Sequence, residues 1–166
     1  MSFIKRLLAD LRTTEPIYPL CGGIGLSVLG FITLMSSGCH PAYRWLLLPR
    51  SALPYWIFAM LGIFLFFLMG AAIGIIFSMS SCQHGVYSSA LCMLLDAVLI
   101  MVWYHVLFRT HGSFIAMIIL LAAMMLWGLA TLNIAGYHIL IPFISLPVLL
   151  IQFHFLWLNI GIRFLN

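Results

Sequence analysis

Charged side chains are scarce in this sequence. Lysine, arginine, aspartate and glutamate together make up 6% of its 166 residues, whereas an ordinary soluble domain carries about 25%. So few charges cannot cover the surface of a soluble domain, and a disordered chain needs low hydrophobicity and high charge. The net charge of +4 is spread so thinly that no more than two basic residues are adjacent. This pattern excludes a nucleic-acid-binding surface.

Motifs of hydrolytic and nucleotide chemistry are also missing. The sequence has no P-loop, no G-x-S-x-G, no H-E-x-x-H and no C-x-x-C. Among its four cysteines, Cys39 and Cys82 are expected on opposite membrane faces, so they cannot meet. Cys82 and His84 are too few ligands to argue for a metal. We therefore expect no disulfide, no metal and no required cofactor, and the sequence gives no support for an enzyme.

Apolar residues are abundant and occupy 65% of the positions. A membrane-spanning helix takes about 20 apolar residues, and five runs reach that length. They lie at about residues 17–37, 53–79, 86–108, 113–132 and 139–162. The expected fold class is an all-α integral membrane protein, a single five-helix transmembrane domain over residues 17–166. The lipid bilayer is its expected environment.

The N-terminal residues 1–16 have a different pattern. Apolar residues recur there at helical spacing, with Lys5, Arg6, Asp10 and Arg12 on the other face. The pattern predicts either an amphipathic helix on the membrane surface or a solvated lead-in to the first span. Three basic residues in this tail against four on the opposite side leave the membrane orientation open.

Polar residues recur every seven positions along the last span. They are His138, Ser145, Gln152, Asn159 and Asn166. Seven residues are nearly two helical turns, so these side chains should form one stripe that faces other helices. Pro142 and Pro147 favour a kink in the same span. His154 falls roughly opposite the stripe, where it either serves a ligand site or forms a hydrogen bond between helices.

Span 86–108 holds an acidic residue, Asp96, near its middle. A charged group at that depth is costly and by default indicates function. No Lys or Arg is expected at similar depth, so we expect the carboxyl group to be protonated. Two interpretations stay open: a proton-linked or ligand-anchoring group, or a protonated acid that forms a hydrogen bond between helices.

The order of several motifs resembles the TspO/MBR family, which comprises tryptophan-rich sensory proteins of bacteria and the mitochondrial translocator protein (peripheral benzodiazepine receptor). The first loop reads AYRWLLLP, the second span LPYWIFAMLGIFLFFLMG and the third LDAVLIMVWY. The family motifs are roughly W-Y-x-x-L-x-K-P, P-P-x-x-x-F-x-x-V-W-x-x-L-Y-x-x-M-G and L-N-x-x-W-x-x-x-F-F. The positions in register are Tyr43, Leu46, Pro49, Pro54, Phe58, Leu65, Met69, Gly70, Leu95, Asp96, Trp103, Tyr104, Pro147, Leu158, Asn159, Leu165 and Asn166.

The resemblance implies a five-helix bundle, commonly a homodimer, with an internal pocket beneath the first loop. Such a pocket would bind a porphyrin or haem, a sterol-like lipid or another hydrophobic small molecule. The implied lining residues are Tyr43, Phe58, Asp96 and Trp103, to which the reasoning on the last span adds His154. Pro49, Pro54, Gly70, Pro147 and Asn159 are expected to be structural. The resemblance also favours a bacterial inner membrane over a mitochondrial outer membrane.

The chain departs from the family at several aromatic positions. Ala42, Gly62, Leu99 and Ile151 stand where the family has tryptophan, and Asp96 stands where it has asparagine. The departures argue against porphyrin photochemistry, which the family's tryptophans support. Two alternatives to a sensor or transporter of hydrophobic molecules stay open: a small proton-linked transporter or channel using Asp96, and a non-catalytic membrane scaffold or assembly subunit.

Overall fold

The computed structural model describes residues 14–79 and 84–166. Most of the N-terminal segment 1–16 and Cys82 lie outside the described residues. The helices are α2 (Ile17–Ser36), α3 (Cys39–Trp45), α4 (Tyr55–Ser78), α5 (His84–Phe108), α6 (Ser113–Ile134) and α7 (Leu140–Leu165). Five of them, all but α3, are long and apolar enough to cross a membrane. The chain is a multi-pass integral membrane protein, and the five predicted spans are confirmed.

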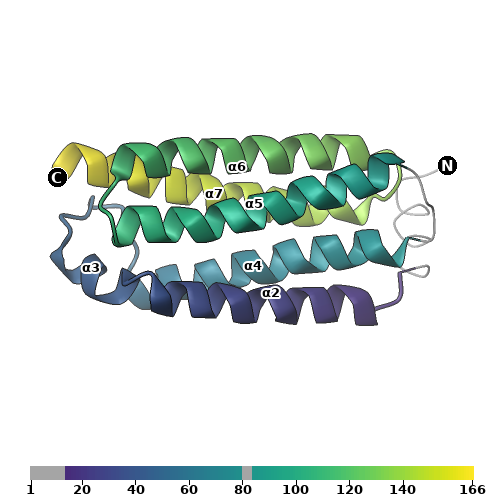
Figure 1. The fold of residues 1–166 in the computed structure, drawn as a ribbon, viewed down its shortest axis with the longest axis horizontal. Coiled ribbons are helices and arrows are strands. Elements are labelled where there is room, and N and C mark those ends of the chain that lie inside the picture. The colour runs from purple at the N-terminus through teal and green to yellow at the C-terminus, as the bar shows by residue number, and fades with distance from the viewer. Residues whose placement is uncertain (1–13, 80–83) are drawn as a thin grey trace.

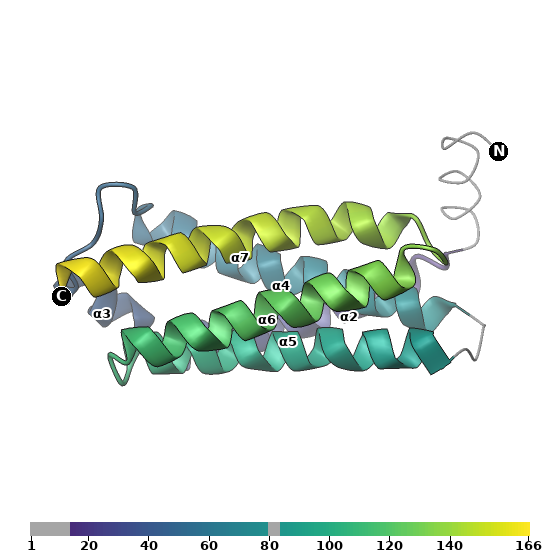
Figure 2. The same cartoon turned by 90° about the horizontal axis from the view of Figure 1, so that it is seen from above.

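The five long helices run side by side along the long axis of the molecule (Figures 1 and 2). Helix α2 packs mainly against α4, and α5 packs mainly against α6. Helix α7 contacts both α6 and α4, so it joins the two pairs. The turn between α5 and α6, helix α3 and the end of α7 lie at one end of the bundle, which we call the α3 end (Figure 1).

Glycine allows α2 and α4 to approach closely. A Cβ atom at Gly70 would lie 2.1 Å from the carbonyl oxygen of Gly22, and one at Gly74 would lie 2.3 Å from that of Tyr18. Lipid offers no hydrophobic drive for helix association, so small residues that bring backbones together set such interfaces. The Gly70–Gly74 pair therefore serves packing within the chain.

The first loop contains a helix that the sequence did not predict. Residues 38–52 lie between the first two predicted spans, and no helix was predicted there. In the structure, α3 begins after Gly38, whose φ of 71° lies in the left-handed region that favours glycine. Helix α3 contacts α2 and α5, and it buries Tyr43. A seven-residue helix is too short to show a clear apolar period in sequence.

The polar stripe on α7 faces protein, as predicted. His138, Ser145, Gln152 and Asn159 are all buried. Ser145 accepts a hydrogen bond from Thr131 of α6 at 2.8 Å. At the end of the helix, Asn166 Nδ2 donates to the carbonyl oxygen of Leu47 at 3.0 Å. Each polar side chain thus ties α7 to another part of the chain.

Candidate functional site

A buried acid–amide pair lies near the middle of the bundle. Nε2 of Gln152 on α7 donates a hydrogen bond to Oδ2 of Asp96 on α5, at 2.9 Å. Both residues are fully buried. The arginines among the described residues lie near the helix ends, and α6 contains no charged residue. The Asp96 carboxyl group therefore has an amide, and not a cation, as its partner.

The other oxygens of this pair are unpaired. Oδ1 of Asp96 and Oε1 of Gln152 have no hydrogen-bond partner among the described residues. Two oxygens can share a hydrogen bond only when one carries a proton, and of these two groups only the carboxyl group can do so. A protonated, neutral Asp96 therefore has a hydroxyl group that could pair with Oε1 of Gln152, while its other oxygen accepts from Nε2. An ionised Asp96 would instead place a charge without a cationic partner in a low-dielectric interior.

Aromatic rings, Phe108 among them, meet between the acid–amide pair and the α3 end. Phe58 of α4 lies at their centre, with its ring centroid 5.0 Å from Phe155 and 5.3 Å from Tyr43. Trp103 stacks on Phe155 at 5.2 Å, with the planes 8° apart. Tyr104 lies 6.0 Å from Phe58. We call Tyr43, Phe58, Trp103, Tyr104 and Phe155 the aromatic cluster.

The aromatic cluster brings together three of the five predicted ligand-binding residues: Tyr43 contacts Phe58 directly, and Phe155 lies between Phe58 and Trp103. Phe58 and Trp103 are fully buried, and Tyr43 is nearly so. The Tyr43 hydroxyl donates to the carbonyl oxygen of Leu53, which fixes α3 to the loop before α4. Burial raises the pKa of Tyr43 to about 12, with a smaller contribution from Cys39. The rings themselves occupy the space beneath the first loop, where the resemblance implies a pocket.

Two polar groups in this cluster lack partners. Nε1 of Trp103 and the hydroxyl of Tyr104 are buried without a hydrogen-bond partner among the described residues. Nε2 of His154 is likewise unpaired, and its ring lies 6.4 Å from that of Phe155. Unpaired donors in an apolar interior are costly. A ligand with hydrogen-bond acceptors would lower this energetic cost if it entered the aromatic cluster.

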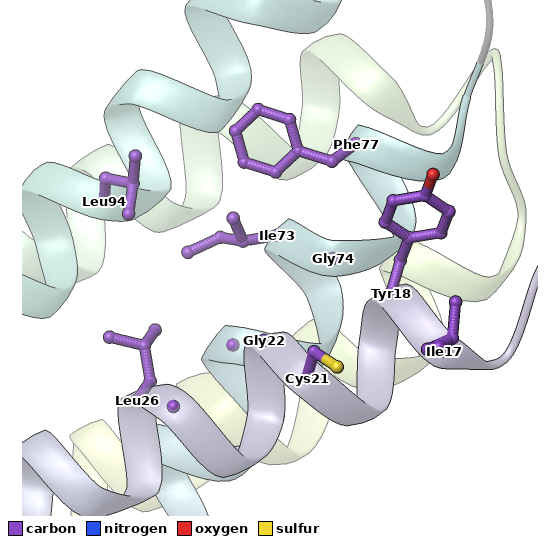
Figure 3. Close-up of a pocket in the computed structure, with 11 residues that line it drawn as sticks. Ile17, Tyr18, Cys21, Gly22, Leu26, Ile73, Gly74, Phe77 and Leu94 are labelled. Atoms are coloured by element: carbon purple, nitrogen blue, oxygen red, sulfur yellow. The ribbon is translucent and has the colours of Figure 1, made fainter.

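An open apolar groove lies elsewhere, between α2, α4 and α5. Its volume is about 840 Å³, within the range of about 300–1,000 Å³ typical of ligand sites. Figure 3 shows the side chains of Leu26, Ile73, Phe77 and Leu94 around this space, with Tyr18 at one end. The groove opens at the end of α2 opposite the α3 end.

Sequence reasoning missed this groove. A Cβ atom at Gly25, one of the lining residues, would meet nothing within 4 Å. Gly22 on the neighbouring turn contacts Gly70 instead. The two glycines look alike in sequence, because both are small residues in an apolar run. The arrangement of α2, α4 and α5 leaves the space next to Gly25 open.

The residues predicted to be structural differ in burial: Gly70 and Asn159 are buried, Pro49 and Pro147 are half-buried, and Pro54 is exposed. Pro49 packs against α7, because a Cβ atom at Gly161 would lie 2.7 Å from its Cγ. Pro54 immediately precedes α4, and Pro147 lies inside α7. Asn159 is buried against the start of α6, where its amide can donate to Ser113 O at 3.2 Å and accept from Met117 N at 2.9 Å.

No group of three or more metal-ligating side chains occurs among residues 14–79 and 84–166. No protein-family model matches the sequence, and comparison with curated proteins gives no significant match.

Proposed function

We propose that this membrane protein is a binding protein of the TspO/MBR type for a hydrophobic small molecule, such as a porphyrin or a sterol-like lipid. The observation that carries the proposal is the groove between α2, α4 and α5. It has the volume of a ligand site and an apolar lining, and it is reached from the hydrocarbon, where hydrophobic molecules concentrate.

The position of the groove supports a ligand taken up from one leaflet. Its lining on α2 extends over residues 17–26, which span roughly 13 Å at 1.5 Å per residue. Half of the hydrocarbon core is about 15 Å thick. A hydrophobic molecule of one leaflet can therefore lie along the groove with its polar end near Tyr18. If the rings of the aromatic cluster moved apart, the cluster would provide a second ligand-binding position, deeper in the bundle.

Protoporphyrin titration tests the proposal, because a bound porphyrin quenches protein tryptophan emission over long distances. We expect saturable quenching with about one ligand per chain. Gly25→Phe fills the groove without meeting a neighbour at Cβ, so it should weaken binding at least about tenfold, as expected for the loss of a well-buried apolar contact. Gly128→Phe is the matched control, since Gly128 also lies in a long helix with open space beside it.

Two results would overturn the proposal. One is the lack of saturable quenching by the purified chain. The other is equal binding by the parent, Gly25→Phe and Gly128→Phe, which would place the porphyrin outside the groove.

A non-catalytic scaffold is the second candidate, and the closed aromatic cluster favours it. Phe58, Trp103 and Phe155 are packed as in a protein core. A scaffold needs such a core and no free cavity. Isolation of a stable partner subunit from native membranes, together with failure of every hydrophobic probe to bind, would support this function. Proton-linked transport has weaker support, because Asp96 pairs with an amide.

A further inference from the structure

The arginines of the described residues all lie at the α3 end of the bundle. They are Arg44 in α3, Arg50 before α4, Arg109 after α5 and Arg163 in the last turn of α7. All four are exposed. Among residues 14–79 and 84–166, the acidic side chains are Glu15, at the opposite end, and the buried Asp96. The α3 end is therefore cationic, with no Asp or Glu side chain of the described part to offset it.

A cleft of about 470 Å³ opens at this cationic end. Its walls come from the end of α2, from α3 and from the turn between α5 and α6. Its lining includes the polar residues Arg109, His111 and Ser36 and the aromatic residues Trp45 and Phe108, of which Phe108 is almost fully buried. Trp45 is 86% exposed, which is unusual for the largest apolar side chain unless a membrane interface surrounds it.

The turn that carries His111 has an uncommon backbone conformation. His111 has a φ of 54°, in the left-handed region that residues other than glycine seldom adopt. Two hydrogen bonds hold the turn, from Gly112 N to Val106 O at 3.1 Å and from Ser113 N to His111 O at 2.9 Å. The turn places His111 beside Arg109 on the wall of the cleft. Such conformations persist where the surrounding structure enforces them, often at ligand sites.

We propose that this cleft binds the phosphate headgroup of an anionic membrane lipid. Arg109 offers a planar set of donors that matches phosphate oxygens, and His111 adds a further donor. Trp45, which is exposed, would contact the glycerol and the first carbons of the acyl chains, because aromatic side chains favour that depth. The anionic surface of a bilayer attracts arginines next to spanning helices. The site is separate from the groove and does not depend on the proposed function.

The test compares two arginines at the same end. Arg109 lines the cleft, whereas the guanidinium of Arg163 lies 4.6 Å from the centroid of the Phe114 ring, outside the cleft lining. The purified chain, Arg109→Gln and Arg163→Gln are equilibrated in detergent with equal amounts of phosphatidylglycerol and phosphatidylcholine. Native mass spectrometry then counts the lipid that each chain retains.

We expect the parent chain to retain phosphatidylglycerol in preference to phosphatidylcholine. Arg109→Gln should lower that retention about tenfold, the effect of losing a charge-assisted hydrogen bond to phosphate. Arg163→Gln should lower it less than about twofold, as a surface charge acting at a distance does. Trp45→Ser should also lower retention, while Trp56→Ser, at an exposed tryptophan outside the cleft lining, should not.

Three outcomes would overturn the proposal. Equal retention of the two lipids would show no headgroup preference. Equal losses in Arg109→Gln and Arg163→Gln would show general electrostatic attraction instead of a site. An adduct with inorganic phosphate that Arg109→Gln removes, without retention of phosphatidylglycerol, would show a site for free phosphate. Circular dichroism of each variant shows whether the helices remain folded in the same detergent.

Discussion

Gln152 donates a hydrogen bond to Asp96 across 2.9 Å, and this contact joins the middle of α7 to the middle of α5. The second oxygens of the two groups are unpaired among the described residues. Both groups would be complete if a neutral acid donated from Oδ1 to Oε1. The pair then links two helices without placing a charge in the membrane interior.

Asp96→Asn should leave the protein nearly as stable as the parent, because an asparagine amide can form both hydrogen bonds with Gln152. We expect the free energy of unfolding to change by less than about 1 kcal/mol, the value of one hydrogen bond. Gln152→Met removes the amide that donates to Oδ2 of Asp96 and should cost about 1–3 kcal/mol. Unfolding by sodium dodecyl sulfate in mixed micelles, followed by circular dichroism, measures these differences.

Infrared spectroscopy checks the protonation state of Asp96 directly. The parent at neutral pH should show the carbonyl stretch of a protonated carboxylic acid, and Asp96→Asn should lack it. Loss of the band in Gln152→Met would show that the protonation of Asp96 depends on the Gln152 amide. Absence of that band from the parent would mean that Asp96 is ionised and that the reciprocal pair does not form.

Gly70→Ala should separate α2 from α4. The added Cβ would lie 2.1 Å from Gly22 O, a backbone atom that cannot move without shifting the helix. We expect a loss of about 1–3 kcal/mol, as for overpacking in a tight core. Gly25→Ala is the matched control, because its Cβ meets nothing within 4 Å and alanine favours helix. Thermal unfolding in detergent should show a lower midpoint for Gly70→Ala only; equal midpoints would contradict the close approach.

Phe155→Ala should destabilise the aromatic cluster. Phe155 is fully buried and contacts both Trp103 and Phe58, and removal of a buried phenylalanine costs about 3–5 kcal/mol. Phe153→Ala, two residues earlier on the same helix, changes a side chain that is 57% exposed. Its effect on the free energy of unfolding should be much smaller. Similar losses for the two variants would mean that the cluster is loosely packed.

The Cys39 thiol should be nearly inert toward maleimides. Cys39 lies in α3, outside the spans, and burial raises the pKa of its thiol to about 12. The thiolate is the reactive form, so at pH 8 its fraction falls about a thousandfold relative to an exposed cysteine. A chain with Cys21, Cys82 and Cys92 changed to serine reports on Cys39 alone.

The rate of this labelling should increase with pH. Because the folded-state pKa lies above the working range, the rate should rise about tenfold for each pH unit between 8 and 10. Unfolding in dodecyl sulfate should restore ordinary reactivity at pH 8. Rapid labelling of the native chain at pH 8 would show that Cys39 is exposed.

The sequence predicted the five spans to within a few residues, because length and hydrophobicity are local properties. It also placed the polar stripe of α7 against protein, since a seven-residue period keeps side chains on one face. The short helix α3 escaped prediction, because it depends on the left-handed conformation of Gly38 and on packing against α2 and α5. The resemblance to the TspO/MBR family, and the homodimer and ligands that it implies, stay predictions.

The sequence alone determined that this is a five-span membrane protein with an acid at mid-membrane, because lipid imposes strict requirements on length and polarity. The partner of that acid was decided by tertiary structure: Gln152 is 56 residues away, and the packing of α7 against α4 and α6 brings it within reach of Asp96 on α5. Tertiary structure also distinguishes two glycines that look alike in sequence. Gly25 borders open space in the groove, whereas Gly22 contacts α4. Contacts between helices depend on their relative rotation and tilt, and these follow from the packing of the whole bundle rather than from any one segment.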